Sequence, residues 1–379
     1  MRRLTRFFLI VLALSLASCG PSLDMLEARA ESGAGEEPPI VNEGRFRSQQ
    51  RGDGKAIWLR FDATDRDLER LKGETGIVFL NLGGGGPNGM RSFVSDNGLQ
   101  YIKGWTSLKE LQACCIPITD AGLAHISGLA KLEKLVLGET RVSDAGLAHL
   151  AGLTQLKELW LDFLPLTDAG AAHLKSLTGL RVLRFHGAAI TDAGLANFAD
   201  MADLEDLQLG YAPITDAGMP IIARMTKLKT LDLRTKVTDV GLAHLERLTE
   251  LRWLCLNETK VGDAGLTHLA GLTKLEWLML EGTRVTDAGM AKLTGLSNLN
   301  TLYLSRTHVT DASTESIAKL RNLTRLKLNE TGITDAGLEK LHGLQQLKDI
   351  ELHKTDVTPA GIQRLKEAIP KLNVAMHQN

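Results

Sequence analysis

The sequence predicts an α/β repeat solenoid, in which stacked copies of one unit build a parallel sheet and a row of short helices. Three observations lead to this prediction. A Thr/Ser-Asp-Ala-Gly-Leu motif returns along the chain, as in residues 119–123, 143–147 and 334–338. From Asp96 to Asp335 the motif aspartates are 24 residues apart, except for one step of 23 between Asp216 and Asp239. Apolar residues keep the same register in each copy, and a fixed period of this length indicates units that stack only on their neighbours.

Two hydrophobic periods meet within one unit, taken as residues 132–155. From Leu135 to Leu137 the leucines stand at alternate positions, which predicts a short strand with one buried face. From Leu147 the leucines recur every three residues, as on a short helix. Strands of successive units are expected to pair into one parallel sheet, because a single unit buries too few side chains to fold alone.

The helix ends carry their own signals. The Thr/Ser-Asp pair that precedes each helical stretch offers side-chain oxygens to the first free backbone amides, so both residues are read as helix caps. Glycines suit the position just past a helix end, and four of them are expected there, namely Gly152, Gly271, Gly295 and Gly343.

The pattern L-x-x-L-x-L followed by a fixed polar position resembles the leucine-rich repeat family. The T-D-A-G-L helix start is similar to its ribonuclease-inhibitor-like and F-box-associated branch. The resemblance covers residues 55–379, about 12 to 13 repeats. It implies a leucine-rich-repeat solenoid shaped as a horseshoe or arc, with the parallel sheet on the concave face and short helices on the convex face.

The chain departs from this family at the position after the strand, where Asn or Cys is usual. Threonine occupies it in several repeats, at Thr140, Thr259, Thr283, Thr307, Thr331 and Thr355, and apolar residues occupy it in others, at Ile116, Leu164, Ala188 and Ala212. The side-chain hydrogen-bond ladder of the family is therefore expected to be partial.

The first unit is predicted to be irregular. Thr64-Asp65 precedes Leu68 and Leu71, and the next motif aspartate follows after 24 residues plus an insertion of 7. The insertion is visible as the glycine-rich run 83–89. A phosphate-binding loop would require a following Gly-Lys-Ser/Thr and a long helix, which are missing, so a flexible turn is favoured.

The N-terminal residues predict export. Arg2, Arg3 and Arg6 precede an apolar run from Phe7 to Leu16, which is too short to span a bilayer and follows the order of a secretory signal. The run ends in Leu16-Ala17-Ser18-Cys19, which resembles the bacterial lipobox. The resemblance implies that residues 1–18 are a lipoprotein signal peptide and that Cys19 is lipidated. The alternative is an ordinary signal peptide with an incidental cysteine.

Residues 19–54 lack periodic apolar residues and are predicted to form a disordered tether between the anchor and the repeat domain. Removing residues 1–18 removes three arginines and no acids, so the net charge falls from -1 to -1 - 3 = -4. This charge does not suggest a nucleic-acid partner. Gly20 after the cysteine favours the outer membrane or its periplasmic side, with display at the cell surface left open.

Candidate chemical sites are few. Histidines recur at one helical position in five repeats, at His125, His149, His173, His244 and His268. A metal site would need several ligands converging on one ion, whereas equivalent positions lie in a row, so a repeated surface position is favoured. No spacing places a general base beside a cysteine, and no disulfide framework emerges from Cys114, Cys115 and Cys255. We expect no catalytic residue, no metal and no cofactor.

The outward-facing strand positions carry the sharper inference. They form three rows, and an unusual number of large apolar residues gathers in three consecutive repeats of these rows, at Trp253, Cys255, Trp277, Met279 and Tyr303, with Trp160 in a similar position earlier in the chain. Trp105, by contrast, replaces a core leucine. Exposed apolar clusters with a polar rim mark interfaces, so these six residues are predicted to bind a partner. Packing of the aromatic residues on one another, or a homodimer through this face, is the alternative.

The sequence thus predicts a non-catalytic binding protein that is anchored in the bacterial envelope and holds a protein or peptide ligand on its sheet. The second hypothesis is a structural or self-associating envelope spacer without a specific ligand. An enzyme or an enzyme inhibitor is the third, and an inhibitor would be a special case of binding.

Overall fold

A computed structural model describes residues 41–42, 46–52, 54–83 and 91–376. The predicted signal peptide, Cys19 and nearly all of the glycine-rich run lie outside these residues. The chain divides into two compact units, Met1–Ile190 and Thr191–Asn379, and each is described by itself.

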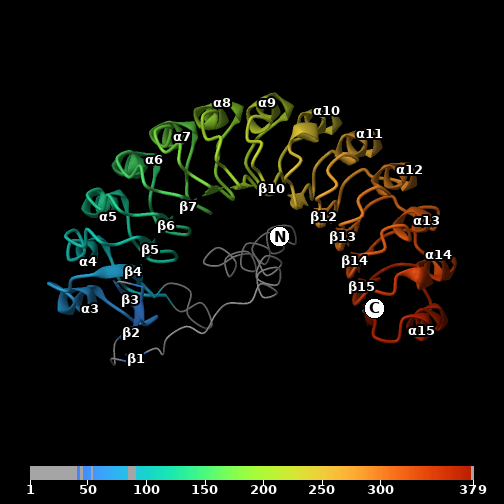
Figure 1. The fold of residues 1–379 in the computed structure, drawn as a ribbon, viewed down its shortest axis with the longest axis horizontal. Helices are drawn as coiled ribbons and strands as arrows, with labels where there is room; N and C mark the ends of the chain where they lie inside the picture. The colour runs from blue at the N-terminus through green and yellow to red at the C-terminus, as the bar shows by residue number, and fades with distance from the viewer. Residues whose placement is uncertain (1–40, 43–45, 53, 84–90, 377–379) are drawn as a thin grey trace, which may run out of the picture. The chain divides into compact units, whose positions relative to one another are not determined.

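The first unit alternates strands and short helices (Figure 1). Its strands are β1 (Val41–Asn42), β2 (Phe46–Arg51), β3 (Gly54–Leu59), β4 (Ile77–Asn81), β5 (Glu110–Gln112), β6 (Lys134–Val136), β7 (Glu158–Trp160) and β8 (Val182–Arg184). Its helices are α3 (Asp65–Arg70), α4 (Asp96–Leu99), α5 (Asp120–Ile126), α6 (Asp144–Leu147), the 3₁₀ turn η2 (Ala148–Leu150) and α7 (Asp168–His173).

The second unit repeats this order. Its strands are β9 (Asp206–Gln208), β10 (Thr230–Asp232), β11 (Trp253–Cys255), β12 (Trp277–Met279), β13 (Thr301–Tyr303), β14 (Arg325–Lys327), β15 (Asp349–Glu351) and β16 (Asn373–Ala375). Its α-helices are α8 (Asp192–Leu195), α9 (Met219–Ile222), α10 (Asp239–Leu242), α11 (Asp263–Leu266), α12 (Asp287–Met290), α13 (Thr314–Ile317), α14 (Asp335–Lys340) and α15 (Pro359–Ala368). The 3₁₀ turns are η3 (Ala196–Phe198), η4 (Asp216–Gly218), η5 (Ala243–Arg247), η6 (Thr267–Leu269), η7 (Ala291–Leu293) and η8 (Leu341–Gly343).

The strands from β3 onward pair in parallel with their sequence neighbours within each unit. Within each unit the strands line the inner edge and the helices the outer edge (Figure 1). The predicted repeat solenoid of parallel strands and short helices is therefore confirmed. In the first repeat Thr64 is the N-cap of α3, which begins at Asp65, and the register shifts between β3 and β4.

One segment departs from the prediction. Residues 46–51 lie in the range predicted to be a tether, yet they form β2, which pairs in antiparallel fashion with β3. The sequence Phe-Arg-Ser-Gln-Gln-Arg has one apolar residue and no alternation of apolar and polar side chains, so it does not predict a strand. This segment is a strand because it pairs with β3, and Ser48 and Gln49 are buried in this pairing.

The core is a stack of leucines between sheet and helices. Leu135 in β6, Leu137 just after it, Leu147 in α6 and Leu150 in η2 are all 0% exposed, and the same positions are buried in the other repeats. Trp105 takes a core position as predicted and is 6% exposed. Among the residues that the structure describes, no helix combines the length and apolar character needed to cross a bilayer.

The motif aspartates link neighbouring repeats. Asp120 is the first residue of α5, and its carboxylate accepts the backbone N–H (2.7 Å) and the hydroxyl (2.6 Å) of Ser143 in the next repeat. The same pair of bonds runs from Asp65, Asp96, Asp144, Asp192, Asp216, Asp263, Asp287, Asp311 and Asp335 to the Ser or Thr of the repeat that follows. The prediction that the aspartates cap their own helices is therefore wrong.

The helix cap is the preceding hydroxyl. Thr119 Oγ1 accepts the backbone N–H of Ala121, and most equivalent threonines do the same. The motif glycine has a distinct reason to be there. A Cβ at Gly146 would lie 2.3 Å from Asp120 Oδ1, so only glycine leaves room for the carboxylate of the preceding repeat.

The threonines after the strands do not form a ladder between repeats. Thr259 Oγ1 donates to the carbonyl of Leu256 in its own repeat (2.6 Å), and Thr283, Thr307 and Thr331 bond in the same way. Thr140 Oγ1 is buried and has no hydrogen-bond partner among the described residues. The four bonded threonines therefore stabilise their own turns.

The predicted glycines past the helix ends are mostly where they were expected. Gly152, Gly271 and Gly295 follow the C-cap residue of the last helical turn, whereas Gly343 is the last residue of η8. None of the four has a positive φ, so they end the helices without the left-handed conformation that usually explains glycine there.

Candidate interaction surface

The strand residues between the buried leucines present two rows on the sheet, and a third row continues just past each strand. Parallel pairing matches Trp253 with Trp277 and Cys255 with Met279, and it matches Met279 in turn with Tyr303. The predicted register of the two strand rows is confirmed by these pairs. Because adjacent strands lie about 4.8 Å apart, side chains of successive repeats in one row touch.

The predicted patch forms one cluster in the second unit. Cys255, Trp277, Met279 and Tyr303 pack together, and Trp253 packs against them. The expectation that these side chains are exposed is wrong for four of them, which are 2%, 8%, 4% and 5% exposed in that order, while Trp253 is half-buried. Indole and phenol rings are wider than the strand spacing, so each lies across its neighbours and covers them.

The rings on the sheet face are covered by the chain's own cations. Lys327 Nζ lies 4.2 Å from the centre of the Tyr303 ring, and Arg325 Cζ lies 5.7 Å from that of Trp277. Each cation also meets a carboxylate one strand further on, Glu351 for Lys327 (3.3 Å) and Asp349 for Arg325 (3.8 Å). The face therefore alternates rings, cations and carboxylates, an arrangement suited to contact with another polar surface.

A group of residues beside the cluster was not singled out from the sequence. Arg234 donates through Nε and Nη2 to the fully buried carboxylate of Asp232, and its Nη1 donates to the Tyr211 hydroxyl (3.2 Å). Arg234 Cζ also lies 4.9 Å from the centre of the Tyr211 ring, which is 46% exposed. Burial raises the pKa of Tyr211, against the opposing effect of Arg234.

Arg234 lies two residues after the end of β10, where both its backbone N–H and its guanidinium reach Asp232. The turn between β10 and Asp239 is one residue shorter than its equivalents. The shorter turn does not account for the place of Arg234, because Asn257 and Glu281 also lie two residues after their strands.

The third row carries a network of amides and acids. Asn257 Oδ1 accepts the backbone N–H of Glu281 (2.8 Å), and Asn257 Nδ2 donates to its carboxylate (3.3 Å). Burial raises the pKa of Glu281, while Lys327 and Arg306 oppose the rise. Asn329 Nδ2 donates to the carboxylate of Glu351 (2.7 Å), and Asn329 Oδ1 accepts the backbone N–H of His353 (2.8 Å). Cys255, at the base of the face, has a pKa raised well above its ordinary value by burial, so it is a protonated thiol and a poor nucleophile.

Trp160 lies in the first unit, in a smaller cluster with Cys114, Cys115 and Val136. It is 3% exposed and lies between Lys134 Nζ (4.7 Å from the ring centre) and Arg184 Cζ (3.9 Å). Lys134 pairs with Glu158 at 2.6 Å. This cluster repeats the ring, cation and carboxylate pattern of the second unit.

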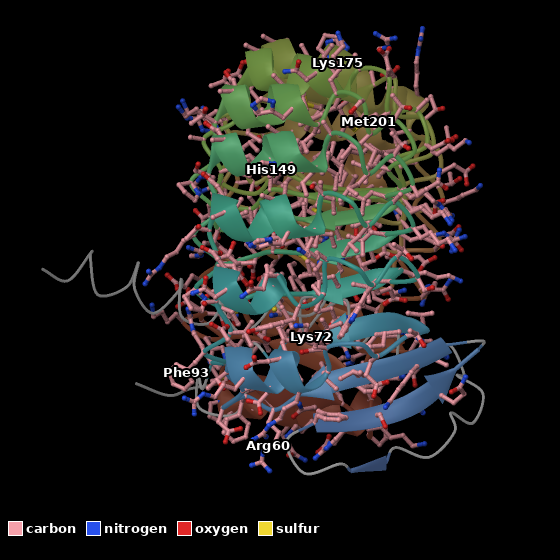
Figure 2. The ribbon with its side chains drawn as sticks, turned by 90° about the vertical axis from the view of Figure 1, so that its left-hand side faces the viewer. Arg60, Lys72, Phe93, His149, Lys175 and Met201 are labelled. Carbon is pink, nitrogen blue, oxygen red and sulfur yellow. The ribbon has the colours of Figure 1, made fainter. Side chains whose placement is uncertain are left out.

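The recurrent histidines lie on the helix side, where they are exposed or half-buried, and His149 is labelled there in Figure 2. The repeated surface position is confirmed. Within the described ranges, no three residues among histidines, cysteines and acids come together as metal ligands.

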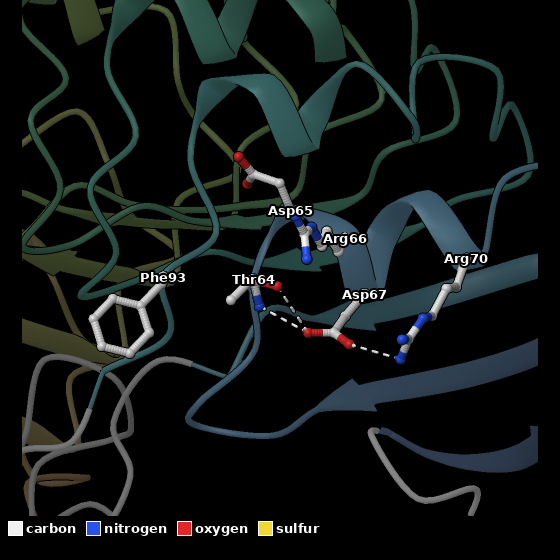
Figure 3. A pocket seen from close by; sticks show the side chains of 6 residues that line it. All are labelled: Thr64, Asp65, Arg66, Asp67, Arg70 and Phe93. Carbon is white, nitrogen blue, oxygen red and sulfur yellow. Dashed lines mark hydrogen bonds and ion pairs between the residues drawn. The ribbon is translucent and has the colours of Figure 1, made fainter.

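A pocket of about 530 Å³ opens beside α3 and was not predicted (Figure 3). Phe93 lies on one side of it and is 68% exposed. Asp67 accepts the backbone N–H of Thr64 (2.9 Å) and meets Arg70 at 3.5 Å, and Asp65 is bonded to Ser95. Its carboxylates are therefore used in holding the first repeat together.

Comparison with known proteins agrees with this architecture. The leucine rich repeat family profile matches residues 273–333. A crystal structure of an internalin, inlF from Listeria monocytogenes, is similar with a TM-score of 0.59 and 25% identity, over 74% of this chain and 83% of that one. A leucine-rich-repeat protein of Leptospira interrogans is similar with a TM-score of 0.58 and 18% identity, over 79% of this chain and 78% of that one. No curated protein sequence matches the chain.

Proposed function

We propose that this leucine-rich-repeat protein is a non-catalytic binding module of the bacterial envelope, which holds a protein or peptide ligand on the sheet face of its second unit. Solenoids present long surfaces that suit extended partners. One observation carries the proposal. The core positions repeat with little change, whereas the sheet-face positions do not, and they gather Trp253, Trp277 and Tyr303 beside charged networks.

The anchor is a separate part of the proposal and depends on sequence alone. Cys19 in its lipobox-like context would carry acyl chains, and the chain would be exported and tethered to the envelope.

The second candidate is a structural or self-associating envelope protein. The near-complete burial of Cys255, Trp277 and Met279 favours it, because a cluster that packs on itself needs no partner. The two candidates differ in what the half-buried Trp253 contacts in the cell.

A crosslinked pull-down from native envelopes tests the proposal. The double variant Trp253→Ala, Trp277→Ala is compared with wild type, and each captured protein is then purified for affinity measurement. We expect the double variant to weaken binding more than about tenfold, as is usual for central aromatic anchors. A control variant, Val240→Ala with His268→Ala on the helix side, should bind like wild type.

Circular dichroism and thermal unfolding come first, because Trp277 is buried. If the variant with Trp277→Ala unfolds, Trp277→Phe replaces it in the binding comparison, because phenylalanine keeps most of the side-chain packing in the cluster. A partner captured equally by folded wild type and folded variant would contradict the sheet face as the site, and capture of the chain's own copies alone would support the structural candidate.

A further inference from the structure

Five aromatic rings on or beside the sheet face share one arrangement. A cation from the chain covers each ring, and that cation also pairs with a carboxylate. The sets are Phe79 with Arg51 and Glu110, Trp160 with Lys134 and Glu158, Tyr211 with Arg234 and Asp232, Trp277 with Arg325 and Asp349, and Tyr303 with Lys327 and Glu351.

Trp253 differs from these five rings. Its register neighbours in the row are Thr230 and Trp277, and no lysine or arginine of the described residues lies over its ring. Its indole Nε1 finds no acceptor there either. It is also the least buried of the clustered residues. Trp253 is therefore partly exposed, and its ring lacks the cation that the five other rings have among the described residues.

An acidic residue lies in the same row as Trp253. Asp206 is two strands away, with Thr230 between them, and it is buried, with its Oδ1 accepting a hydrogen bond from Gln208 Nε2 (3.1 Å). Arg325 shows that a guanidinium on this sheet can span that distance, because it reaches Trp277 from two strands away across Thr301. A cation over Trp253 would thus contact an indole ring and lie in a row that also carries the negative charge of Asp206.

We propose that the partner supplies this cation, so that an arginine or lysine side chain of a bound protein or peptide lies over Trp253. This inference rests on the proposed function and names the chemistry of its ligand. Indole is the strongest of the aromatic side chains for such contacts, and arginine uses them more often than lysine. Arginine-bearing ligands are therefore expected to bind best.

Peptide selection followed by a double-mutant cycle tests the inference. A displayed library of random linear peptides is selected on the full-length chain, and each bound peptide is remade with every Arg or Lys changed singly to Gln. On wild type, one such change should weaken binding by about threefold to tenfold. On Trp253→Leu, which keeps an apolar side chain without the ring, the same change should have no effect.

Two further variants sharpen the result. Trp253→Phe keeps a ring and should retain most of the coupling, which a purely structural role of this side chain would not predict. Trp277→Phe changes a ring that is already covered by Arg325, and should leave the coupling intact.

The outcomes separate the two proposals. Peptides that depend on Trp253 but tolerate the loss of their cations, or that are selected for acidic residues, would overturn the inference alone. Peptides that bind Trp253→Leu and wild type equally would overturn the sheet face as the site, and with it the proposed function. A dimer of the chain that dissociates in Trp253→Leu would show that a second copy, rather than a cationic peptide, covers this ring.

Discussion

At the scale of the residue, the motif Thr/Ser-Asp-Ala-Gly-Leu is explained atom by atom. The hydroxyl caps its own helix, the aspartate binds the next repeat, and the glycine leaves room for the aspartate of the preceding repeat. The leucine is buried in the core. Contacts thus explain four of the five residues. Two of them make hydrogen bonds, and the glycine leaves space for a carboxylate that makes them.

Gly262 is the exception that permits a test. It replaces the Ser or Thr, so Asp239 receives only a backbone N–H (2.6 Å). Its backbone is extended, as at the equivalent threonines, and an added Cβ would lie 3.5 Å from Asp239 Oδ2, an ordinary contact. We expect Gly262→Ser to raise the free energy of unfolding by about 1 kcal/mol, through a new hydrogen bond and a new helix cap.

Urea unfolding of the full-length chain measures this change. Gly271→Ser is the matched control, because a Cβ there meets no atom within 4 Å. Equal effects of the two substitutions would show that loss of glycine flexibility, and not the bond to Asp239, accounts for the gain.

At the scale of the element, the turn after the strand obeys a rule that the sequence does not reveal. One residue there has a positive φ in most repeats, although it is seldom glycine, as at Glu139, Glu258, Arg306 and Lys354. The backbone N–H of Glu139 donates to the carbonyl of Asp162 in the next repeat, and those of Glu258 and Arg306 do likewise. The left-handed conformation thus extends hydrogen bonding between repeats past the end of each strand.

The last repeat ends the series of aspartates. Asp335 binds Thr358, but Pro359 stands where the next aspartate would be, so no carboxylate is offered to a further repeat. The pKa of Asp335 is held below its ordinary value of 3.8 by the backbone N–H and hydroxyl of Thr358 and by Arg364, against the effect of burial.

This lowered pKa predicts a dependence of stability on pH. A carboxylate with a lowered pKa in the folded state stabilises the chain above the unfolded pKa, and the contribution is lost as pH falls through the folded pKa. The difference in unfolding free energy between wild type and Asp335→Asn should therefore be constant near neutral pH and shrink below about pH 3.8. Urea titrations at a series of pH values measure it.

Asp356, in the repeat that follows, provides the control, because its carboxylate makes no hydrogen bond within the described residues. Asp356→Asn should show a smaller change over the same range of pH. A difference for Asp335→Asn that stays the same at every pH would mean that its bonds to Thr358 do not depend on ionisation.

At the scale of the whole molecule, the proposed envelope location depends on Cys19. We expect wild type to incorporate labelled palmitate and to fractionate with membranes, and Cys19→Ser to lose both properties, since acyl chains would be the anchor. Cells that express each form are labelled and fractionated. Labelling of neither form would favour an ordinary signal peptide, and membrane association of the unlabelled variant would indicate a second mode of attachment.

The sequence alone determined the repeat, the strand and helix of each unit, the buried leucines and the register of the strand rows, because a fixed period with two hydrophobic patterns permits one stacked arrangement. It also located the aromatic cluster around Trp277. It did not determine β2, which depends on pairing with β3. It also did not determine that the aspartates link neighbouring repeats, because a side-chain oxygen at a helix start is usually interpreted as a helix cap. Only the tertiary structure decided that the cluster is buried, that cations cover most of its rings and that no cation covers Trp253. These features depend on which side chains of the neighbouring one or two strands, about 5 to 10 Å away, contact each ring.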